Sequence, residues 1–107
     1  AEAADLVARY PRDPRAHLYR GIAFLIDGHD YADAEEQFRR ARATGDLPGA
    51  GLDPDFDKTV TVLLALTVAD ERRPDEGRAL GAPLCGFADE KLPDLADGLR
   101  RYGICGD

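Results

Sequence analysis

Apolar residues recur along the chain at the three- and four-residue spacing of amphipathic helices, and Pro, Gly or Asp interrupts the pattern. The spacing predicts helices over residues 1–10, 14–28, 31–45, 54–70, 75–84 and 93–102, with a loop over 45–52. Asp13-Pro14 and Asp53-Pro54 are typical helix starts, because Asp accepts a bond from a first-turn N–H and Pro has none to leave unpaired. The pattern therefore predicts an all-α chain.

One segment has a second interpretation. Thr59-Val60-Thr61-Val62 alternates as a strand does, and β-branched residues favour strands. The aspartate start and the length of the apolar pattern favour a helix. Residues 18–26 and 60–69 are apolar almost all round, which predicts helices that are covered on more than one side.

The helix predicted over 31–45 is more one-sided. Its acids lie near the start and its arginines near the end, which complements the helix dipole. Two ion pairs at i,i+4 spacing are expected, Glu35–Arg39 and Glu36–Arg40. We interpret this charged surface as a solvated helix face.

Composition narrows the class of protein. The chain has 107 residues, which suits one domain, and 44% of them are hydrophobic, enough to form a core. Its net charge of −7 argues against binding to nucleic acid or to an anionic membrane surface. The longest apolar run, residues 60–69, is too short to span a bilayer. Because the chain begins at Ala1 without a signal peptide, we expect it to be part of a longer protein.

The segment from Pro14 to Ala43 resembles a tetratricopeptide repeat, a unit of about 34 residues with a small residue in its first helix and an Ala–Phe–Ala pattern in its second. Gly21 takes the small position, where two helices cross closely, and Phe24 takes the aromatic position after it. The second-helix pattern is supplied by Ala34, Phe38 and Ala41. The turn at Gly28-His29-Asp30 is one residue longer than the repeat allows for.

The resemblance implies a short α-solenoid of stacked antiparallel helix pairs, closed by a C-terminal capping helix. Its parts would be residues 1–12 (the second helix of a truncated repeat), 13–45 (a repeat), 53–85 (a degenerate repeat) and 88–105 (the capping helix). In the degenerate unit, Ala65 takes the small position and Gly77 the first alanine position. Gly81 departs from the pattern, because an aromatic residue is expected there.

Tetratricopeptide domains bind peptides or partner proteins on a concave face lined by their first helices. The resemblance places five residues on that face: Arg15, Leu18, Tyr19, Ile22 and Leu25. Leu18 and Ile22 stand where some members carry polar residues that clamp a peptide carboxylate, so an apolar or amphipathic partner segment is expected instead. The alternative is that the last helix of the chain itself packs into this face.

Other kinds of site have weak support. Asp53, Asp55 and Asp57 match the start of a calcium loop, but Lys58 and Leu64 replace its essential Gly and Glu. The two histidines, His17 on the exposed side of a helix and His29 in a turn, lack partners at metal-ligand spacing. The chain has no serine and no recognisable nucleophile motif. We expect no catalytic residue, metal or cofactor.

Cys85 and Cys105 flank the last predicted helix, twenty residues apart. Two states are open: a disulfide that ties this helix to the preceding pair, or two buried thiols in a reducing compartment. The compartment itself is not encoded in the chain.

A second resemblance carries a different expectation. The segments Tyr10–Tyr19 and Leu99–Cys105 are similar to soluble extensions that follow the membrane domain in some bacterial rhomboid-type intramembrane proteases. This resemblance implies a regulatory extension of a protease whose catalytic residues lie elsewhere. The leading expectation remains a non-catalytic module that binds a protein or peptide, with self-association or the capping of a repeat array as the structural alternative.

Overall fold

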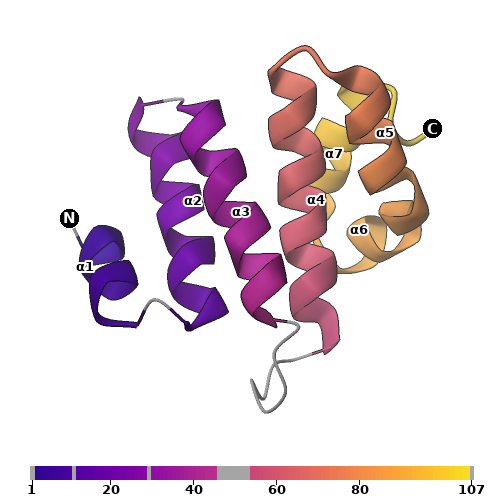
Figure 1. Ribbon diagram of the computed structural model, residues 1–107. Helices are drawn as coiled ribbons and strands as arrows, with labels where there is room; N and C mark the ends of the chain where they lie inside the picture. Colours follow the sequence, from indigo (N-terminus) through magenta and orange to yellow (C-terminus); the bar gives the residue numbers. More distant parts are fainter. Residues whose placement is uncertain (1, 11, 29, 46–53, 107) are drawn as a thin grey trace. The chain divides into compact units, whose positions relative to one another are not determined.

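The computed structural model describes residues 2–10, 12–28, 30–45 and 54–106, and these form helices and turns without a strand (Figure 1). The helices are α1 Glu2–Arg9, α2 Pro14–Gly28, α3 Tyr31–Gly45, α4 Pro54–Asp70, α5 Pro74–Gly81, a 3₁₀ turn at Ala82–Leu84, α6 Cys85–Lys91 and α7 Pro93–Arg101. They belong to two compact units, residues 1–57 and 58–107. The all-α prediction is confirmed, and Thr59–Val62 lie inside α4 rather than in a strand. The predicted loop after Gly45 and the Asp53 cap lie outside the described residues.

The first unit is built on the antiparallel pair α2 and α3, with α1 packed against α2 (Figure 1). The pair crosses at Gly21, where an added Cβ would lie 2.6 Å from Cε1 of Phe38. Phe38 is fully buried, as are Ala34 and Ala41 on the same face of α3. Asp30 begins α3 as predicted, because its Oδ1 lies 3.4 Å from the backbone N–H of Asp33. A residue without a side chain at position 21 therefore lets an aromatic ring fill the crossing.

The second unit closes around residues of α4, α6, α7 and the C-terminal segment. Its buried core consists of Val62, Ala65, Ala69, Ala88, Ala96, Leu99, Ile104 and Cys105. Gly81 of α5, which stands where the repeat pattern expects an aromatic residue, faces this core. A Cβ there would lie 2.9 Å from Cγ2 of Ile104 and 3.1 Å from Cβ of Ala65. The space that an aromatic ring would need is thus filled by the chain's own C-terminal segment.

The region after α5 differs from the prediction. The helix expected over 75–84 ends at Gly81 and continues as the 3₁₀ turn, and α6 was not predicted at all. The last helix, expected over 93–102, is α7 Pro93–Arg101, and the segment 88–105 that was assigned to the capping helix also contains the end of α6. Leu92 separates the two helices with φ −135° and ψ 60°, a non-helical conformation that agrees with Pro93 disfavouring the helical one at the residue before it. A 2.7 Å ion pair between Arg100 and Asp89 joins α7 to α6.

Two helix ends share one motif with different residues. At the end of α4, Arg72 has φ 63°, the Arg72 N–H donates to the Ala69 carbonyl, and the Arg73 N–H donates to the Val68 carbonyl. At the end of α7, Gly103 has φ +71° and the same two bonds are made by the N–H groups of Gly103 and Ile104. Both ends are Schellman motifs, in which glycine is the favoured residue at the left-handed position.

This comparison predicts a stabilising substitution. Arg72→Gly removes a left-handed arginine and is expected to raise the free energy of unfolding by about 0.5–1 kcal/mol, after the entropy cost of glycine. Gly103→Ala places a Cβ in the same conformation and should lower it by about 1 kcal/mol. Urea denaturation of both variants measures the two effects. Arg72→Ala is the control, because it removes the arginine side chain but keeps the strain; stabilisation as large as that of Arg72→Gly would contradict the explanation.

Candidate functional site: an exposed stripe on α2

Helix α2 carries a row of large side chains at its surface. Ile26 is 72% exposed and Tyr19 is 51% exposed, while Arg15 is exposed and Ile22 half-buried. The four residues follow one another at intervals of four, three and four positions, so they lie on one face of the helix. We call Arg15, Tyr19, Ile22 and Ile26 the α2 stripe. The opposite side of α2 contains the buried residues His17 and Gly21.

A surface pocket lies at the N-terminal end of the stripe. It is lined by Tyr10, Asp13, Arg15, Ala16 and Tyr19, and Tyr10 is 55% exposed. Asp13 Oδ1 accepts a 2.9 Å bond from the backbone N–H of Arg15. The guanidinium of Arg15 donates to the same carboxylate at 3.2 Å from Nε and 3.0 Å from Nη2. Asp13 therefore begins α2 and also fixes one wall of the pocket.

The ion pair sets the charge state of this pocket. The side-chain hydrogen bond from Arg15 lowers the pKa of Asp13 below its ordinary value of 3.8, against a smaller opposing effect of burial. The same bond raises the pKa of Arg15. The two charges largely cancel, so the pocket presents two tyrosine rings beside a neutralised pair.

Asp13→Ala is expected to lower the free energy of unfolding by about 1 kcal/mol at neutral pH, because the helix loses its N-terminal acceptor. The pKa of Asp13 is lowered in the folded protein, so its contribution is complete above the ordinary pKa of 3.8 and is lost as the pH falls through the folded value. Denaturation from pH 7 to pH 2 should therefore show the two proteins converging at the acidic end. A difference that persists undiminished at pH 2 would contradict this assignment.

The surface differs from the face expected from the sequence. Arg15 and Tyr19 are exposed, but Leu18, Ile22 and Leu25 are each half-buried. The expectation that residues 18–26 are covered on more than one side is wrong along the stripe, since Ile26 is the most exposed large apolar residue described. Ile26 was missed because periodicity alone does not show which apolar residue of an almost wholly apolar helix stays uncovered. Tyr10 was missed because it lies before α2, outside the helix that the resemblance assigned to the binding face.

The apolar residues of the last helix lie in the core of its own unit, where Ala96 and Leu99 of α7 pack.

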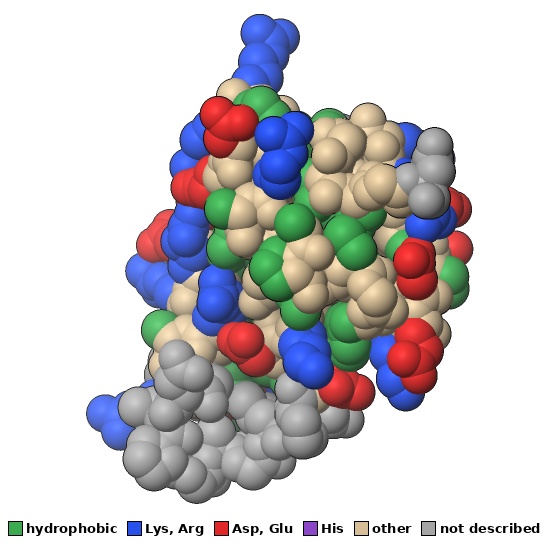
Figure 2. All heavy atoms as spheres, turned by 90° about the vertical axis from the view of Figure 1, so that its right-hand side faces the viewer, with side chains coloured by type: hydrophobic (Ala, Val, Ile, Leu, Met, Phe, Trp, Pro, Cys, Tyr) green, Lys and Arg blue, Asp and Glu red, His purple; other side chains and the backbone are tan. Residues whose placement is uncertain are grey.

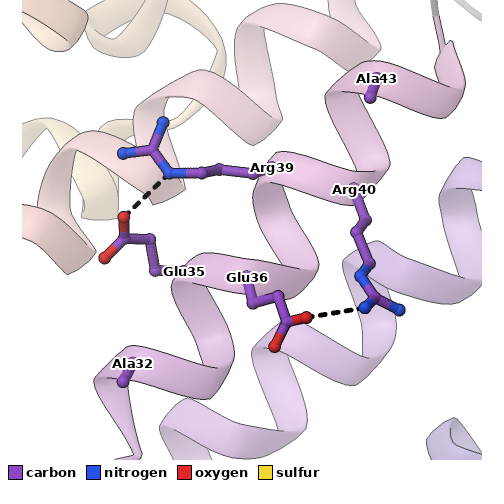
Figure 3. Close-up of a pocket in the computed structure, with 6 residues that line it drawn as sticks. All are labelled: Ala32, Glu35, Glu36, Arg39, Arg40 and Ala43. Atoms are coloured by element: carbon purple, nitrogen blue, oxygen red, sulfur yellow. Dashed lines mark hydrogen bonds and ion pairs between the residues drawn. The ribbon is translucent and has the colours of Figure 1, made fainter.

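A second surface pocket lies on α3 (Figure 3). Its walls are Ala32, Glu35, Glu36, Arg39, Arg40 and Ala43. The two predicted ion pairs are present, at 2.8 Å for Glu35–Arg39 and 2.7 Å for Glu36–Arg40. Both ion pairs join residues of the same helix, and the side chains of Glu36, Arg39 and Arg40 are largely exposed, so this surface supports a solvated face rather than a site for chemistry.

His17 is not on the exposed side of its helix, as the sequence suggested. His17 is only 3% exposed, and its Nδ1 lies 2.8 Å from Oε1 of Gln37 on α3. The side chain of His17 thus helps to join α2 and α3. His29 lies outside the described residues. Within the ranges that the structure describes, no group of three or more His, Cys, Asp or Glu residues is arranged to hold a metal ion.

Cys85 and Cys105 are joined by a disulfide with an S–S distance of 2.01 Å. Cys85 is the first residue of α6 and Cys105 follows α7, so the bridge encloses two helices rather than the one expected. Their Cα atoms are 5.8 Å apart, within the usual range. The bridge fixes the segment that carries Ile104 onto the core of the second unit.

Figure 2 shows hydrophobic side chains near the middle of the face that carries α5 and α6, among charged side chains. Residues 79–88 contain no charged side chain, and Ala79, Ala82, Pro83 and Gly86 are exposed there. These residues are small, so this patch lacks the large exposed side chains of the α2 stripe.

Among the described helices, none combines the length and the apolar character that a membrane span requires.

Comparison of the chain with protein-family models, with curated proteins and with solved structures gives no match. The α2 stripe is thus interpreted from its own geometry and chemistry.

Proposed function

We propose that this chain is a non-catalytic protein-interaction domain that binds a protein or peptide along the α2 stripe. One observation carries the proposal. Four large hydrophobic residues are exposed among those described, Tyr10, Tyr19, Ile26 and Tyr102, and the first three lie on α2 or just before it. Exposed apolar residues that gather in one place, rather than singly, indicate an interaction surface. Tyrosines are also common at such surfaces, because they combine a large apolar ring with a hydroxyl group.

The α2–α3 pair supports a tetratricopeptide-like arrangement for this domain. Gly21 packs directly against Phe38, and Ala34 and Ala41 are fully buried at the spacing of that repeat. In such an arrangement α2 is the first helix of the unit and contributes to the binding face. We propose that the domain is an accessory part of a larger protein and carries no catalytic residue of its own.

Selection from a displayed library of random peptides tests the proposal. The full chain is the bait, and Ile26→Glu and Tyr19→Glu are parallel baits that keep the fold, because both side chains are more than half exposed. We expect peptides that are enriched on the wild-type chain and lost on both variants. Tyr102→Glu is the matched control, since Tyr102 is 39% exposed in the second unit.

Two outcomes would overturn the proposal. The first is that no peptide is enriched, or that the enriched peptides bind the Glu variants equally well. The second is that sedimentation equilibrium shows a dimer that Ile26→Glu dissociates, because the stripe would then serve self-association.

A further inference from the structure

The spacing of the α2 stripe is that of a helix-packing seam. Arg15, Tyr19, Ile22 and Ile26 alternate steps of four and three residues, as the a and d positions of packed helices do. From Arg15 to Ile26 the helix rises about 16 Å, or about three turns. A second helix of about twelve residues could therefore follow the stripe along its whole length.

The backbone of α2 restricts the conformation of any ligand on this surface. Its N–H and C=O groups are used within the helix, so α2 offers no edge with which an extended peptide could form main-chain hydrogen bonds. An extended segment lying on tyrosine and isoleucine side chains would leave part of its own backbone against apolar groups without partners. A helix satisfies its backbone internally, which makes it the better ligand for such a surface.

Charges of opposite sign mark the two ends of the stripe. Before and at its N-terminal end, Arg9, Arg12 and Arg15 are exposed. At the other end, Asp27 closes α2 while Asp30 and Asp33 begin the next helix, and all three are exposed. A side-chain hydrogen bond with Asp30, and after it the negative charge of that neighbour, raises the pKa of Asp33. Asp13 offsets one positive charge at the arginine end.

We propose that the α2 stripe binds an amphipathic helix of a partner protein, whose large apolar residues recur every three to four positions and whose acidic and basic residues lie at opposite ends. The acidic end lies beside Arg9 and Arg12, and the basic end beside Asp27 and Asp30. Steering by these charges raises the association rate and fixes the direction of the bound helix. The proposal rests on the function proposed above and adds the conformation and the charge order of the ligand.

Three synthetic peptides of one length test whether the ligand binds as a helix. The first has Leu at a and d positions, Glu in its first turn and Lys in its last. The second has the same residues in an order without helical period. The third is the first peptide with one polar residue at its centre replaced by proline. This substitution breaks the helix but keeps the order of the apolar residues. Each is titrated into the ¹⁵N-labelled full chain, and peptide helicity is followed by circular dichroism.

We expect the first peptide to shift the backbone amide signals of residues 15–26 and to gain helicity on binding. The second and third should bind at least tenfold more weakly, and Ile26→Ala should weaken the first about tenfold, because this side chain has the most surface left to bury. Tyr102→Ala should leave the affinity unchanged. Equal binding of the proline peptide would contradict the inference that the ligand binds as a helix. The peptides selected from the library would still test the proposed interaction function in that case.

A nitroxide label at either end of the first peptide tests the charge order. A label at the Lys end should broaden the amide signals near Asp27 and Gly28, and a label at the Glu end those near Tyr10 and Arg12. Equal broadening at both ends of α2 from either label would overturn the assigned direction. Failure of the first peptide to bind, beside library peptides that do bind at the stripe, would overturn the inference but not the proposed function.

Discussion

Phe38→Ala is expected to lower the free energy of unfolding of the first unit by about 3–5 kcal/mol, the usual cost of removing a buried aromatic side chain. Phe38 is fully buried, and its ring fills the crossing of α2 and α3 at Gly21. The two helices are also joined by the contact between His17 and Gln37, which hinders them from closing this gap. Hydrogen exchange with peptide-level resolution measures the effect, with the loss of protection expected over α2 and α3.

A double-mutant cycle provides the control. Gly21→Ala alone places a Cβ 2.6 Å from Cε1 of the Phe38 ring and should cost about 1–3 kcal/mol through overpacking. Phe38→Leu removes that ring atom, so the double variant should be more stable than the sum of the two single effects predicts. Strict additivity would show that Gly21 and Phe38 do not share the crossing as described.

Reduction of the Cys85–Cys105 disulfide is expected to lower the free energy of unfolding of the second unit by about 3 kcal/mol. The bridge joins residues separated by 20 positions, and closing a loop of this size restricts the unfolded chain by about that amount in the chain-entropy model. Urea denaturation of one sample with and without a phosphine reductant measures the effect without any change of sequence. Hydrogen exchange should place the loss over α6, α7 and the C-terminal segment.

The double variant Cys85→Ser and Cys105→Ser is the matched control, because reductant should leave its stability unchanged. Alkylation followed by mass measurement checks the starting state. Two freely alkylated thiols in the untreated native protein would contradict the bridge itself, and a loss of protection confined to α2 and α3 would contradict its assignment to the second unit.

The helix ends that are marked by a proline or a glycine in the sequence were predicted closely. Pro14 and Pro54 begin α2 and α4 where expected, and Gly45 ends α3. Helix α6 was missed for a physical reason: no side-chain cap precedes Cys85, and Leu84 makes no capping bond there. The left-handed conformation of Arg72 could not be predicted either, because it is imposed by the closing bonds of α4 and not by the residue itself.

The candidate site was predicted in part. The resemblance to a tetratricopeptide repeat pointed to α2 and named Arg15 and Tyr19, which are exposed. The sequence did not separate the half-buried Leu18 and Leu25 from the exposed Ile26, because side chains on two adjacent faces of α2 are apolar and only the packing of α1 and α3 distinguishes them. His17 was misplaced for the opposite reason, since a polar side chain with a buried partner such as Gln37 looks like a surface residue until the partner is known.

The disulfide also changes how proteolysis of this chain has to be measured. Lys91 is exposed at the end of α6, between the two cysteines, and is a natural trypsin site. A cut after Lys91 opens the backbone but leaves both pieces covalently joined through sulfur, so a non-reducing gel would show a band of unchanged mass. A cut at Lys91 becomes visible only after reduction, and a chain that is already nicked there would otherwise be counted as intact.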